Sequence, residues 1–347
     1  MIKVLVVEDS PVVREFLIYI LGSDPEIEII GTAKNGKEAI EALRNKKPDI
    51  ITMDIHMPEM DGYEATRRIM ETQPLPIIIV SGSTSVGEVA MTFKAVEAGA
   101  LSVVARPKGI GHPDYEATAK ELIQTVKLMS EVKVVRRWPL SKKEAPPPAP
   151  GIEVRKALPA IQVVAIGAST GGPVALQTIL SGLPRDFPVP VLIVQHITTG
   201  FLEGFAGWLG QSSSLPVHIA SEDEYLLSGH TYLAPDGFHM VVKARNRIAL
   251  SMAEPKDGLR PSVSHLFNSV ARVFGQNAIG VLLTGMGKDG AQELKLMRDK
   301  GAVTIAQDEA SSIVHGMPGE AIKISAATYV LSLERIAAVL ASLVKGK

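Results

Sequence analysis

The chain lacks cysteine altogether, and its 347 residues carry nearly balanced charge, with 36 lysines and arginines against 37 aspartates and glutamates. Without thiols there is no disulfide, no thiolate nucleophile and no zinc–thiolate site. A net charge of −1 gives no basic surplus for nucleic-acid binding. No apolar run approaches the roughly 18 residues of a membrane span, and the N-terminus has no signal-peptide pattern. We therefore expect a cytoplasmic protein with no nucleic-acid partner and no direct membrane insertion.

Two α/β patterns make up most of the chain. Residues 1–127 contain five short apolar strands separated by helical patterns, and five such βα units predict a doubly wound parallel sheet. The expected strands are Lys3–Val7, Ile27–Ile30, Ile50–Met53, Pro76–Val80 and Leu101–Val104. A second α/β pattern covers residues 160–347 and is interrupted by a stretch of hairpin character at His230–Ala234, His239–Val242 and Arg247–Ser251. The fold class is therefore α/β, with two doubly wound parallel-sheet domains.

Residues 128–159 lie between the two patterns and differ from both in composition. They contain six prolines, including Pro146-Pro147-Pro148, and the basic pairs Arg136-Arg137 and Lys142-Lys143. This composition is typical of a semi-extended linker. We expect a domain at 1–127, a Pro-rich linker at 128–159 and a second domain at 160–347.

Acidic residues follow the first and third strands of the N-terminal domain. Glu8 and Asp9 come directly after the first strand, and Asp54 directly after the third. In a doubly wound sheet the site lies at the carboxyl ends of the strands, so these side chains should converge. Carboxylates that converge repel one another unless a divalent cation lies among them, and oxygen ligands suit Mg²⁺. A carboxylate beside Mg²⁺ can accept a phosphoryl group.

The segments VLVVEDSPVVR, ITMDIHMPEMDG, IIIVSG and RPKG make residues 1–127 similar to response-regulator receiver domains, which have a flavodoxin-like fold. The resemblance implies that Asp54 is the phosphorylated residue. It also implies that Glu8, Asp9 and Asp54 hold Mg²⁺, and that the hydroxyl of Ser81 moves toward the phosphoryl group.

Two positions of the switch region depart from the receiver pattern. Arg106 stands where the family has a lysine, and Val103 stands where it often has an aromatic residue. Arginine keeps the positive charge of lysine but presents a longer, planar group. Both departures concern how phosphorylation is transmitted and leave the fold unaffected.

In the second domain, an apolar strand at Ile161–Ile166 leads into the turn GASTGG. Ser169 should therefore lie between the end of a strand and the start of a helix, and Pro173 suits the first helical turn. Three interpretations are open. The turn could be a nucleophile elbow of the G-x-S-x-G type, a phosphate cradle as in dinucleotide sites, or a purely structural turn.

Two further strand ends favour the nucleophile. His196 follows the strand VPVLIVQ, and Asp289 lies in the glycine-rich turn after the strand at Ala278–Leu283. Strand ends of one parallel sheet share an edge, so Ser169, His196 and Asp289 can meet. The histidine can take the serine proton while the aspartate orients the imidazole. The order Ser–His–Asp differs from those of α/β-hydrolases, chymotrypsin and subtilisin, which suggests a distinct fold.

The other polar residues of this half support fewer conclusions. The remaining histidines show no metal-ligand spacing, so we expect no cofactor for this chemistry. Ser262 follows Arg260-Pro261 at the start of a helical pattern, and we expect it to be the N-cap of that helix. Arg260 could alternatively orient a substrate carboxylate.

Several segments make residues 160–347 similar to the catalytic domain of chemotaxis protein-glutamate methylesterases, the CheB family. They are GASTGG, QH followed by GF, LAPDGFHM, RPSV, TGMGKDGA and QDEASSIVHGMP. The resemblance implies a Rossmann-like methylesterase domain with Ser169 as nucleophile, His196 as base and Asp289 as the orienting acid. Thr170 and Met286 would line the site, with backbone donors for the oxyanion. Ile197-Thr198 stands where the family usually has Met-Pro.

The two resemblances together imply phosphorylation-activated hydrolysis of glutamate γ-methyl esters on chemoreceptors, with release of methanol. Some family members also deamidate receptor glutamines. The implied partners are methylated chemoreceptor cytoplasmic domains as substrate and a chemotaxis histidine kinase as phosphodonor. The receiver would gate the esterase.

Three alternatives are kept. The same kind of esterase could serve a chemosensory pathway other than motility. A dinucleotide-binding oxidoreductase is disfavoured because the spaced G-x-G-x-x-G and its following acidic residue are missing. A phosphorylation-switched DNA-binding regulator is disfavoured because the second half has no helix-turn-helix signature and no basic face.

Overall fold

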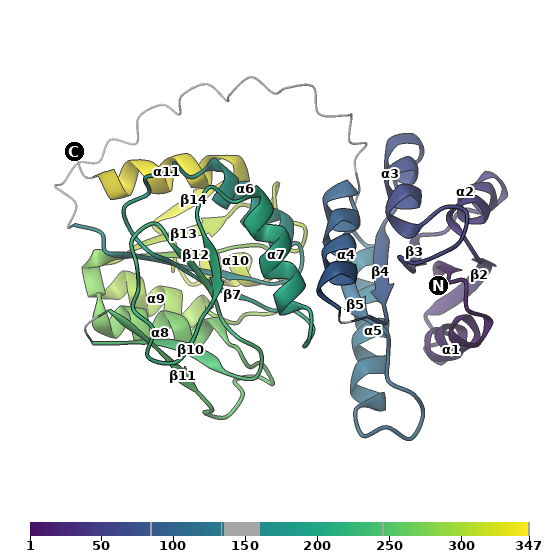
Figure 1. Ribbon diagram of the computed structural model, residues 1–347, viewed down its shortest axis with the longest axis horizontal. Coiled ribbons are helices and arrows are strands. Elements are labelled where there is room, and N and C mark those ends of the chain that lie inside the picture. The colour runs from purple at the N-terminus through teal and green to yellow at the C-terminus, as the bar shows by residue number, and fades with distance from the viewer. Residues whose placement is uncertain (84, 133, 135–159, 245, 346–347) are drawn as a thin grey trace. The chain divides into compact units, whose positions relative to one another are not determined.

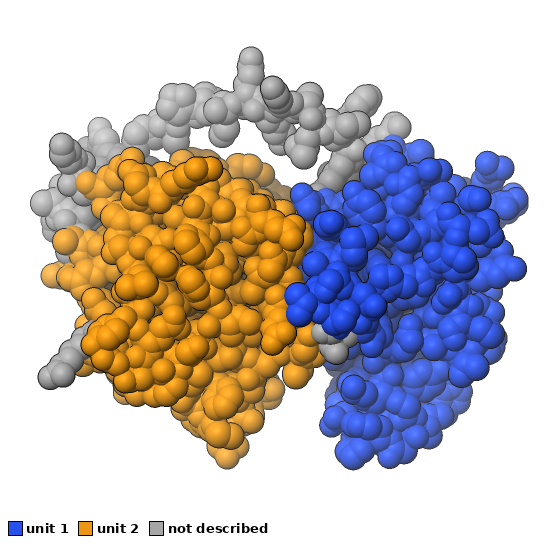
Figure 2. Space-filling view, viewed as in Figure 1, with its two compact units in different colours: residues 1–145 blue, residues 146–347 orange. Residues whose placement is uncertain are grey.

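The computed structural model describes residues 1–83, 85–132, 134, 160–244 and 246–345. The chain divides into two compact units, residues 1–145 and 146–347 (Figure 2). Most of the expected linker, residues 135–159, lies outside the described residues, so its bounds stay a prediction. Within the described ranges, no helix combines the length and the apolar composition needed to cross a bilayer.

The N-terminal unit is a five-stranded parallel sheet with helices on both faces (Figure 1). Its elements are β1 (Ile2–Val7), α1 (Pro11–Gly22), β2 (Ile27–Ala33), α2 (Gly36–Asn45), β3 (Ile50–Met53), α3 (Gly62–Thr72), β4 (Ile77–Ser81), α4 (Val86–Ala98), β5 (Ser102–Ala105) and α5 (Tyr115–Ser130). Helices α1 and α5 pack against each other, whereas α2, α3 and α4 pack in succession. All five strands that the sequence predicts are present, with ends that differ by up to three residues.

Strand order β2-β1-β3-β4-β5 puts the reversal of direction between β1 and β3. Ligands of doubly wound sheets bind where the order reverses, at the carboxyl ends of the strands. Local caps keep the helices that leave this edge in place. The side chain of Asn35 accepts a hydrogen bond from Glu38 N at the start of α2, and Asp61 accepts one from Glu64 N at the start of α3.

The C-terminal unit contains a seven-stranded parallel sheet and a separate two-stranded antiparallel hairpin. Its elements are β6 (Val163–Ala168), α6 (Gly172–Gly182), β7 (Val191–Gln195), α7 (Leu202–Ser212), β8 (Val217–Ile219), β9 (Thr231–Leu233), β10 (His239–Lys243), β11 (Arg247–Ser251), α8 (Val263–Val273), η1 (Gly275–Asn277), β12 (Ala278–Leu282), α9 (Ala291–Asp299), β13 (Val303–Gln307), α10 (Met317–Lys323), β14 (Tyr329–Leu331) and α11 (Leu333–Lys345). Strand order β14-β13-β12-β6-β7-β9-β8 makes β6 the strand at which the order reverses.

The expected hairpin is smaller than the sequence suggests. Of the three expected strands, β10 and β11 pair in antiparallel fashion, whereas β9 pairs in parallel with both β7 and β8 and so belongs to the main sheet. The prediction that residues 230–234 belong to the hairpin is therefore wrong. The alternation of apolar residues identifies a strand but not its partner, because pairing depends on the tertiary fold.

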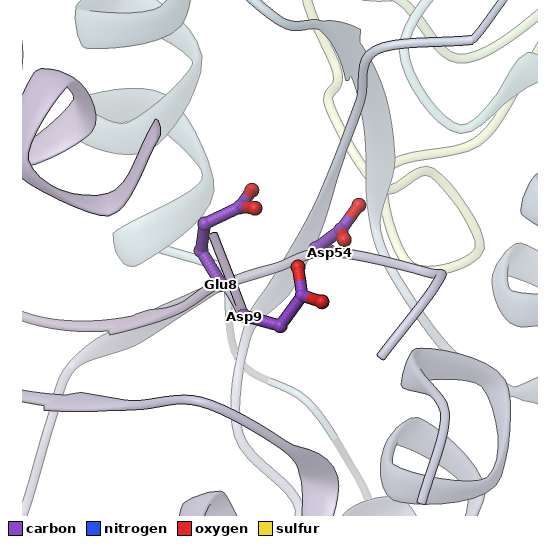
Figure 3. A group of neighbouring side chains, drawn as sticks. All are labelled: Glu8, Asp9 and Asp54. Atoms are coloured by element: carbon purple, nitrogen blue, oxygen red, sulfur yellow. The ribbon is translucent and has the colours of Figure 1, made fainter. Parts of the chain in front are cut away.

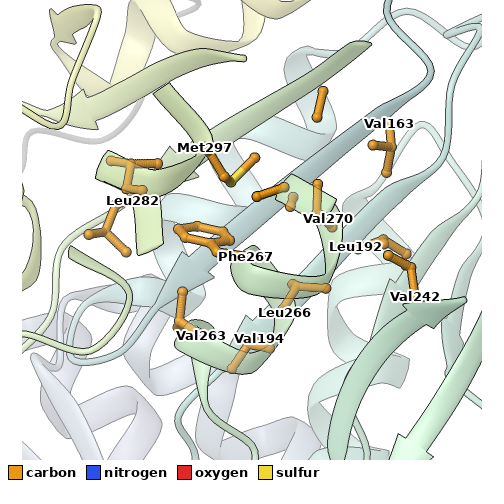
Figure 4. Packing of buried hydrophobic residues seen from close by; sticks show 14 of the residues in the cluster. Val163, Leu192, Val194, Val242, Val263, Leu266, Phe267, Val270, Leu282 and Met297 are labelled. Atoms are coloured by element: carbon orange, nitrogen blue, oxygen red, sulfur yellow. The ribbon is translucent and has the colours of Figure 1, made fainter. Parts of the chain in front are cut away.

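A buried apolar cluster fixes helix α8 on the sheet (Figure 4). Leu266, Phe267 and Val270 of α8 are fully buried in it, together with Val163 of β6 and Leu192 of β7. Truncating such a side chain to alanine lowers the free energy of unfolding by about 2–5 kcal/mol. This packing therefore fixes the position of α8 on the sheet. The position of the N-terminus of α8 follows from this packing, and that N-terminus contributes to the site described below.

Candidate functional sites

Three carboxylates converge at the switch point of the N-terminal sheet (Figure 3). Glu8 and Asp9 follow β1, Asp54 follows β3, and one oxygen of each lies within 4.8 Å of the others. Glu8 is 1% exposed and Asp54 is 7% exposed. The structure thus brings together the three residues that the sequence suggested for a metal.

The electrostatics of this cluster favour a cation. Burial and the neighbouring charge of Asp54 raise the pKa of Glu8 to about 7, although Arg106 and the N–H of Ser10 oppose the shift. Burial also raises the pKa of Asp54, against the effect of Arg106. These buried carboxyl groups disfavour being ionised at the same time. A hard divalent cation, which binds oxygen ligands, would stabilise their ionised forms.

Arg106 supplies the positive charge beside these acids. Its Nη2 lies 3.2 Å from Glu8 Oε2 and 3.9 Å from Asp54 Oδ1. The guanidinium lies against Gly82, where an added Cβ would come within 2.9 Å of it. Ser81 is 3% exposed, and its carbonyl accepts a hydrogen bond from Arg106 N at 2.8 Å. Val103 is half-buried in β5. Of the two switch positions that depart from the receiver pattern, Val103 is on β5, the strand next to the one that carries Ser81, and Arg106 directly follows β5.

Ser169 lies at the turn that follows β6, the strand at which the order of the C-terminal sheet reverses. Its N–H donates to Thr284 O at 3.1 Å, and its carbonyl accepts from Gly172 N at 2.8 Å. Gly171, with φ of 79°, is in the left-handed region that favours glycine. A Cβ on Gly285 would lie 2.7 Å from Ser169 Cβ, so the two turns touch. Ser169 is therefore held between the N-terminus of α6 and the turn that leads to Asp289.

His196 and Asp289 form a direct pair in the same place. Nε2 of His196 lies 3.0 Å from Oδ2 of Asp289. Because an ionised carboxylate only accepts, this nitrogen carries the proton, and Nδ1 is left as the basic nitrogen. His196 N donates to Ala168 O at 3.0 Å, which ties the histidine to the residue that precedes Ser169. The structure thus brings together all three strand ends that the sequence singled out. Between Ser169 and His196, both described, it records no side-chain hydrogen bond.

The N-terminus of α8 holds the Asp289 carboxylate. Oδ1 accepts from Ser262 Oγ at 2.9 Å, Ser264 Oγ at 2.7 Å and Ser264 N at 3.1 Å, while Oδ2 accepts from Val263 N at 2.7 Å. Burial alone would raise the pKa of Asp289, but the hydrogen bonds from His196, Ser264 and Ser262 hold it well below its usual range. A helix N-terminus that binds an anion explains how a buried carboxylate stays ionised beside the histidine.

Part of this arrangement is not predictable from the sequence. Ser262 is the expected N-cap, and its Oγ accepts from Ser264 N at 3.2 Å. That the same helix end binds Asp289 was not foreseen, nor was the role of Ser264, which also lies 2.6 Å from Glu293 Oε2. The S-x-S pattern indicates the start of a helix. The anion bound there is the carboxylate of Asp289, which lies 25 residues after Ser264 in the sequence. Only the fold brings that anion to the helix.

Thr170 and Met286 lie on the two turns that meet at Ser169. The carbonyl of Thr170 accepts a hydrogen bond from Thr284 Oγ1 at 2.9 Å. Met286 is 51% exposed although it is a large apolar residue. Arg260 approaches the carbonyls of Met252 and Ala253 at 3.4 Å each, at the end of the hairpin. These contacts do not place Arg260 against the His196–Asp289 pair.

The fold and the two sites define a class of two-domain protein, in which a response-regulator receiver precedes an α/β domain with a histidine–aspartate pair at its switch point. Residues 4–112 match the family described as the response regulator receiver domain, and residues 164–340 match CheB methylesterase. The chain belongs to the CheB methylesterase family. This membership replaces the oxidoreductase and DNA-binding alternatives.

Relatives and a solved structure agree with this assignment. The chain is 62% identical to the protein-glutamate methylesterase/protein-glutamine glutaminase of Nitrosospira multiformis, over 99% of this chain and 97% of the relative. It is 56% identical to such a protein of Geobacter metallireducens, over the full length of both. The crystal structure of the Thermotoga maritima CheB methylesterase catalytic domain is 36% identical, with a TM-score of 0.52, and covers 53% of this chain and 100% of that one.

Proposed function

We propose that Ser169, His196 and Asp289 hydrolyse γ-methyl esters of glutamate side chains on chemoreceptors, and the side-chain amide of glutamine at the same sites. The observation that carries this proposal is the His196–Asp289 pair, which uses Nε2 and not Nδ1 of a histidine whose main chain is bonded to Ala168, the residue before Ser169. The names of the relatives, which pair methylesterase with glutaminase, support both reactions.

The proposed chemistry follows from the residues. Ser169 Oγ attacks the ester carbonyl while Nδ1 of His196 takes its proton, and Asp289 stabilises the imidazolium. Main-chain N–H groups of the turn at Ser169 would stabilise the developing oxyanion; within α6, Gly172 N already donates to Ser169 O and Pro173 has no N–H. The C–O bond to the methoxy group then breaks, and His196 returns the proton to give methanol. Water, deprotonated by His196, hydrolyses the acyl-enzyme; with glutamine the leaving group is ammonia.

Ser262 and Ser264 also touch this network through Asp289, and the contacts of Ser264 argue against a nucleophilic role. Its Oγ is bonded to the carboxylates of Asp289 and Glu293, and the residue is 3% exposed. A nucleophile needs a base nitrogen and access to substrate. Ser264 instead helps to hold Asp289 in place.

The receiver is proposed to regulate this reaction through phosphorylation of Asp54 by a chemotaxis histidine kinase. Glu8, Asp9 and Asp54 would hold Mg²⁺, which would neutralise the incoming phosphoryl group. Arg106 and Ser81 would respond to that group. The clustered carboxylates and the raised pKa of Glu8 support this assignment.

A serine-directed fluorophosphonate probe tests the proposal, combined with methanol release from a methylated receptor fragment. We expect labelling at Ser169 and loss of methanol release after labelling. Labelling at Ser264, or turnover that survives full labelling of Ser169, would contradict the assignment.

A further inference from the structure

One buried side chain touches both the serine and the histidine of the proposed site. Gln195 is the last residue of β7 and is 5% exposed. Its Nε2 donates to the carbonyl of Ser169 at 2.9 Å and to the carbonyl of His196 at 2.7 Å. A single amide group therefore links the main chains of two residues that must meet at a fixed distance.

The surroundings of the amide oxygen, Oε1 of Gln195, show that the amide has one favoured orientation. Gln195 Oε1 is buried and has no hydrogen-bond partner among the described residues. It faces Gly172, the first residue of α6, where an added Cβ would lie only 2.0 Å away. Turning the amide over would set Oε1 against two carbonyl oxygens. The two donated hydrogen bonds thus hold the group, although its oxygen is left without a partner.

We propose that Gln195 is a positioning residue, which fixes the separation between Ser169 Oγ and Nδ1 of His196 by tying their carbonyl groups together. The proposal rests on the proposed roles of Ser169 and His196. Gly172 belongs to the same device, because only a residue without Cβ leaves room for the amide. Catalysis is sensitive to such placement, since a displacement of about 1 Å costs about 100-fold in rate.

Two different substitutions disrupt the hydrogen bonds from Gln195 to the carbonyls of Ser169 and His196. Gln195→Met keeps the length and most of the volume but has no donors. Gly172→Ala leaves the glutamine in place and brings a Cβ to within 2.0 Å of its amide oxygen, the tightest of the new contacts, with Ala168 Cβ next at 2.9 Å. For each we expect kcat for methanol release to fall about 10- to 100-fold, while KM stays within about threefold, because positioning acts on the chemical step.

Matched controls separate positioning from general damage. Gln177→Met changes a half-buried glutamine of α6 for which no side-chain hydrogen bond is recorded in the described part of the chain. Gly207→Ala adds a Cβ in α7 where nothing lies within 4 Å. Both controls should keep wild-type kcat. The double variant Gln195→Met/Gly172→Ala should lose little more than either single variant, because both changes act on one amide.

Three results decide the matter in the full-length protein. Loss of kcat at constant KM, without additivity, supports the proposal. A kcat within about threefold of wild type in variants with wild-type melting temperature overturns it, as do additive losses that track falling melting temperature. Ser169→Ala is measured in parallel. If that variant stays active, the proposed function has failed, whereas an inactive Ser169→Ala with a normal Gln195→Met shows that only the positioning role is wrong.

Discussion

At the scale of single residues, Ser169 on the turn after β6 and Ser264 beside the Asp289 carboxylate lie in different surroundings. Ser169 lies on the turn between β6 and α6, next to the strand β7 that His196 follows. Ser264 is enclosed at the N-terminus of α8 and donates to acids. The difference separates a hydroxyl that can react from one that orients a neighbour.

The pair Ser169→Ala and Ser264→Ala tests this distinction. We expect Ser169→Ala to remove nearly all ester hydrolysis while the protein stays folded, and His196→Ala to do about the same, because members of such a unit are not additive. Ser264→Ala should lower kcat by about 10- to 150-fold, in line with the loss of one hydrogen bond to a charged group, about 1.5–3 kcal/mol. Methanol release and melting temperature are the measurements. Substantial activity in Ser169→Ala would sink the nucleophile assignment.

A third residue-scale prediction concerns Arg106. Its guanidinium spans Glu8 and Asp54 in the structure, which a compact lysine ammonium would do less readily. The arginine can neutralise a phosphoryl group, but its planar guanidinium cannot occupy the point between Asp54 and Ser81 that a lysine ammonium would occupy. We expect Arg106→Lys to increase stimulation by a small phosphodonor without raising the unstimulated rate. Methanol release at matched phosphorylation checks this, and equal or lower stimulation would show that arginine is a tolerated replacement.

At the scale of elements, the sequence predicts strands better than it predicts their partners. Strand β3 is found at the predicted residues, Ile50–Met53, because a short buried run between turn signals has few other solutions. Strand β9 was assigned to the hairpin, because three residues cannot reveal that they pair in parallel with β7. The strand-end acids, serine and histidine were predictable because parallel strands bring their carboxyl ends to one edge. The donors of α8 were not, because a helix end shows no preference for a particular anion in the sequence.

The carboxyl groups that follow β1 and β3 lie close together, and the buried Glu8 among them predicts how the stability of the receiver depends on pH. The pKa of Glu8 rises from 4.5 to about 7 on folding, so the folded receiver binds this proton more tightly than the unfolded chain does. The resulting contribution to the free energy of unfolding is fully present below pH 4.5 and is lost as the pH rises through about 7. This contribution is at most about 3 kcal/mol. Without Mg²⁺, the melting temperature of the receiver transition should fall between pH 5 and pH 8, and Mg²⁺ at pH 8 should restore it.

Glu8→Gln and a surface control complete this test by calorimetry on the full chain. Glu8→Gln should flatten the pH dependence of the receiver transition and weaken the response to Mg²⁺. Glu41→Gln, at an exposed position of α2, should behave as wild type. An unchanged pH dependence in Glu8→Gln would show that burial of this carboxyl does not control the stability of the receiver.

At the scale of the whole molecule, the two units have separate chemistry: one holds the acidic cluster and the other the histidine–aspartate pair. A separate crystal structure exists for the Thermotoga maritima catalytic domain, which is similar to residues of the second unit, so this unit is expected to fold alone. A regulatory receiver must then act by changing the access of substrate to Ser169 or its activity. Its effect is measurable as the difference between the full chain and residues 160–347.

We predict that deletion of residues 1–159 raises the basal rate of methanol release, because the unphosphorylated receiver holds the esterase in check. Asp54→Asn in the full chain should keep the basal rate and lose stimulation by a phosphodonor, because the amide cannot accept the phosphoryl group. Ser169→Ala in the truncated chain gives the background rate. If the truncated chain is no more active than the unphosphorylated full chain, while fluorophosphonate labels Ser169 equally in both, inhibition by the receiver is the wrong explanation, and phosphorylation must then act by raising the activity of an already accessible site.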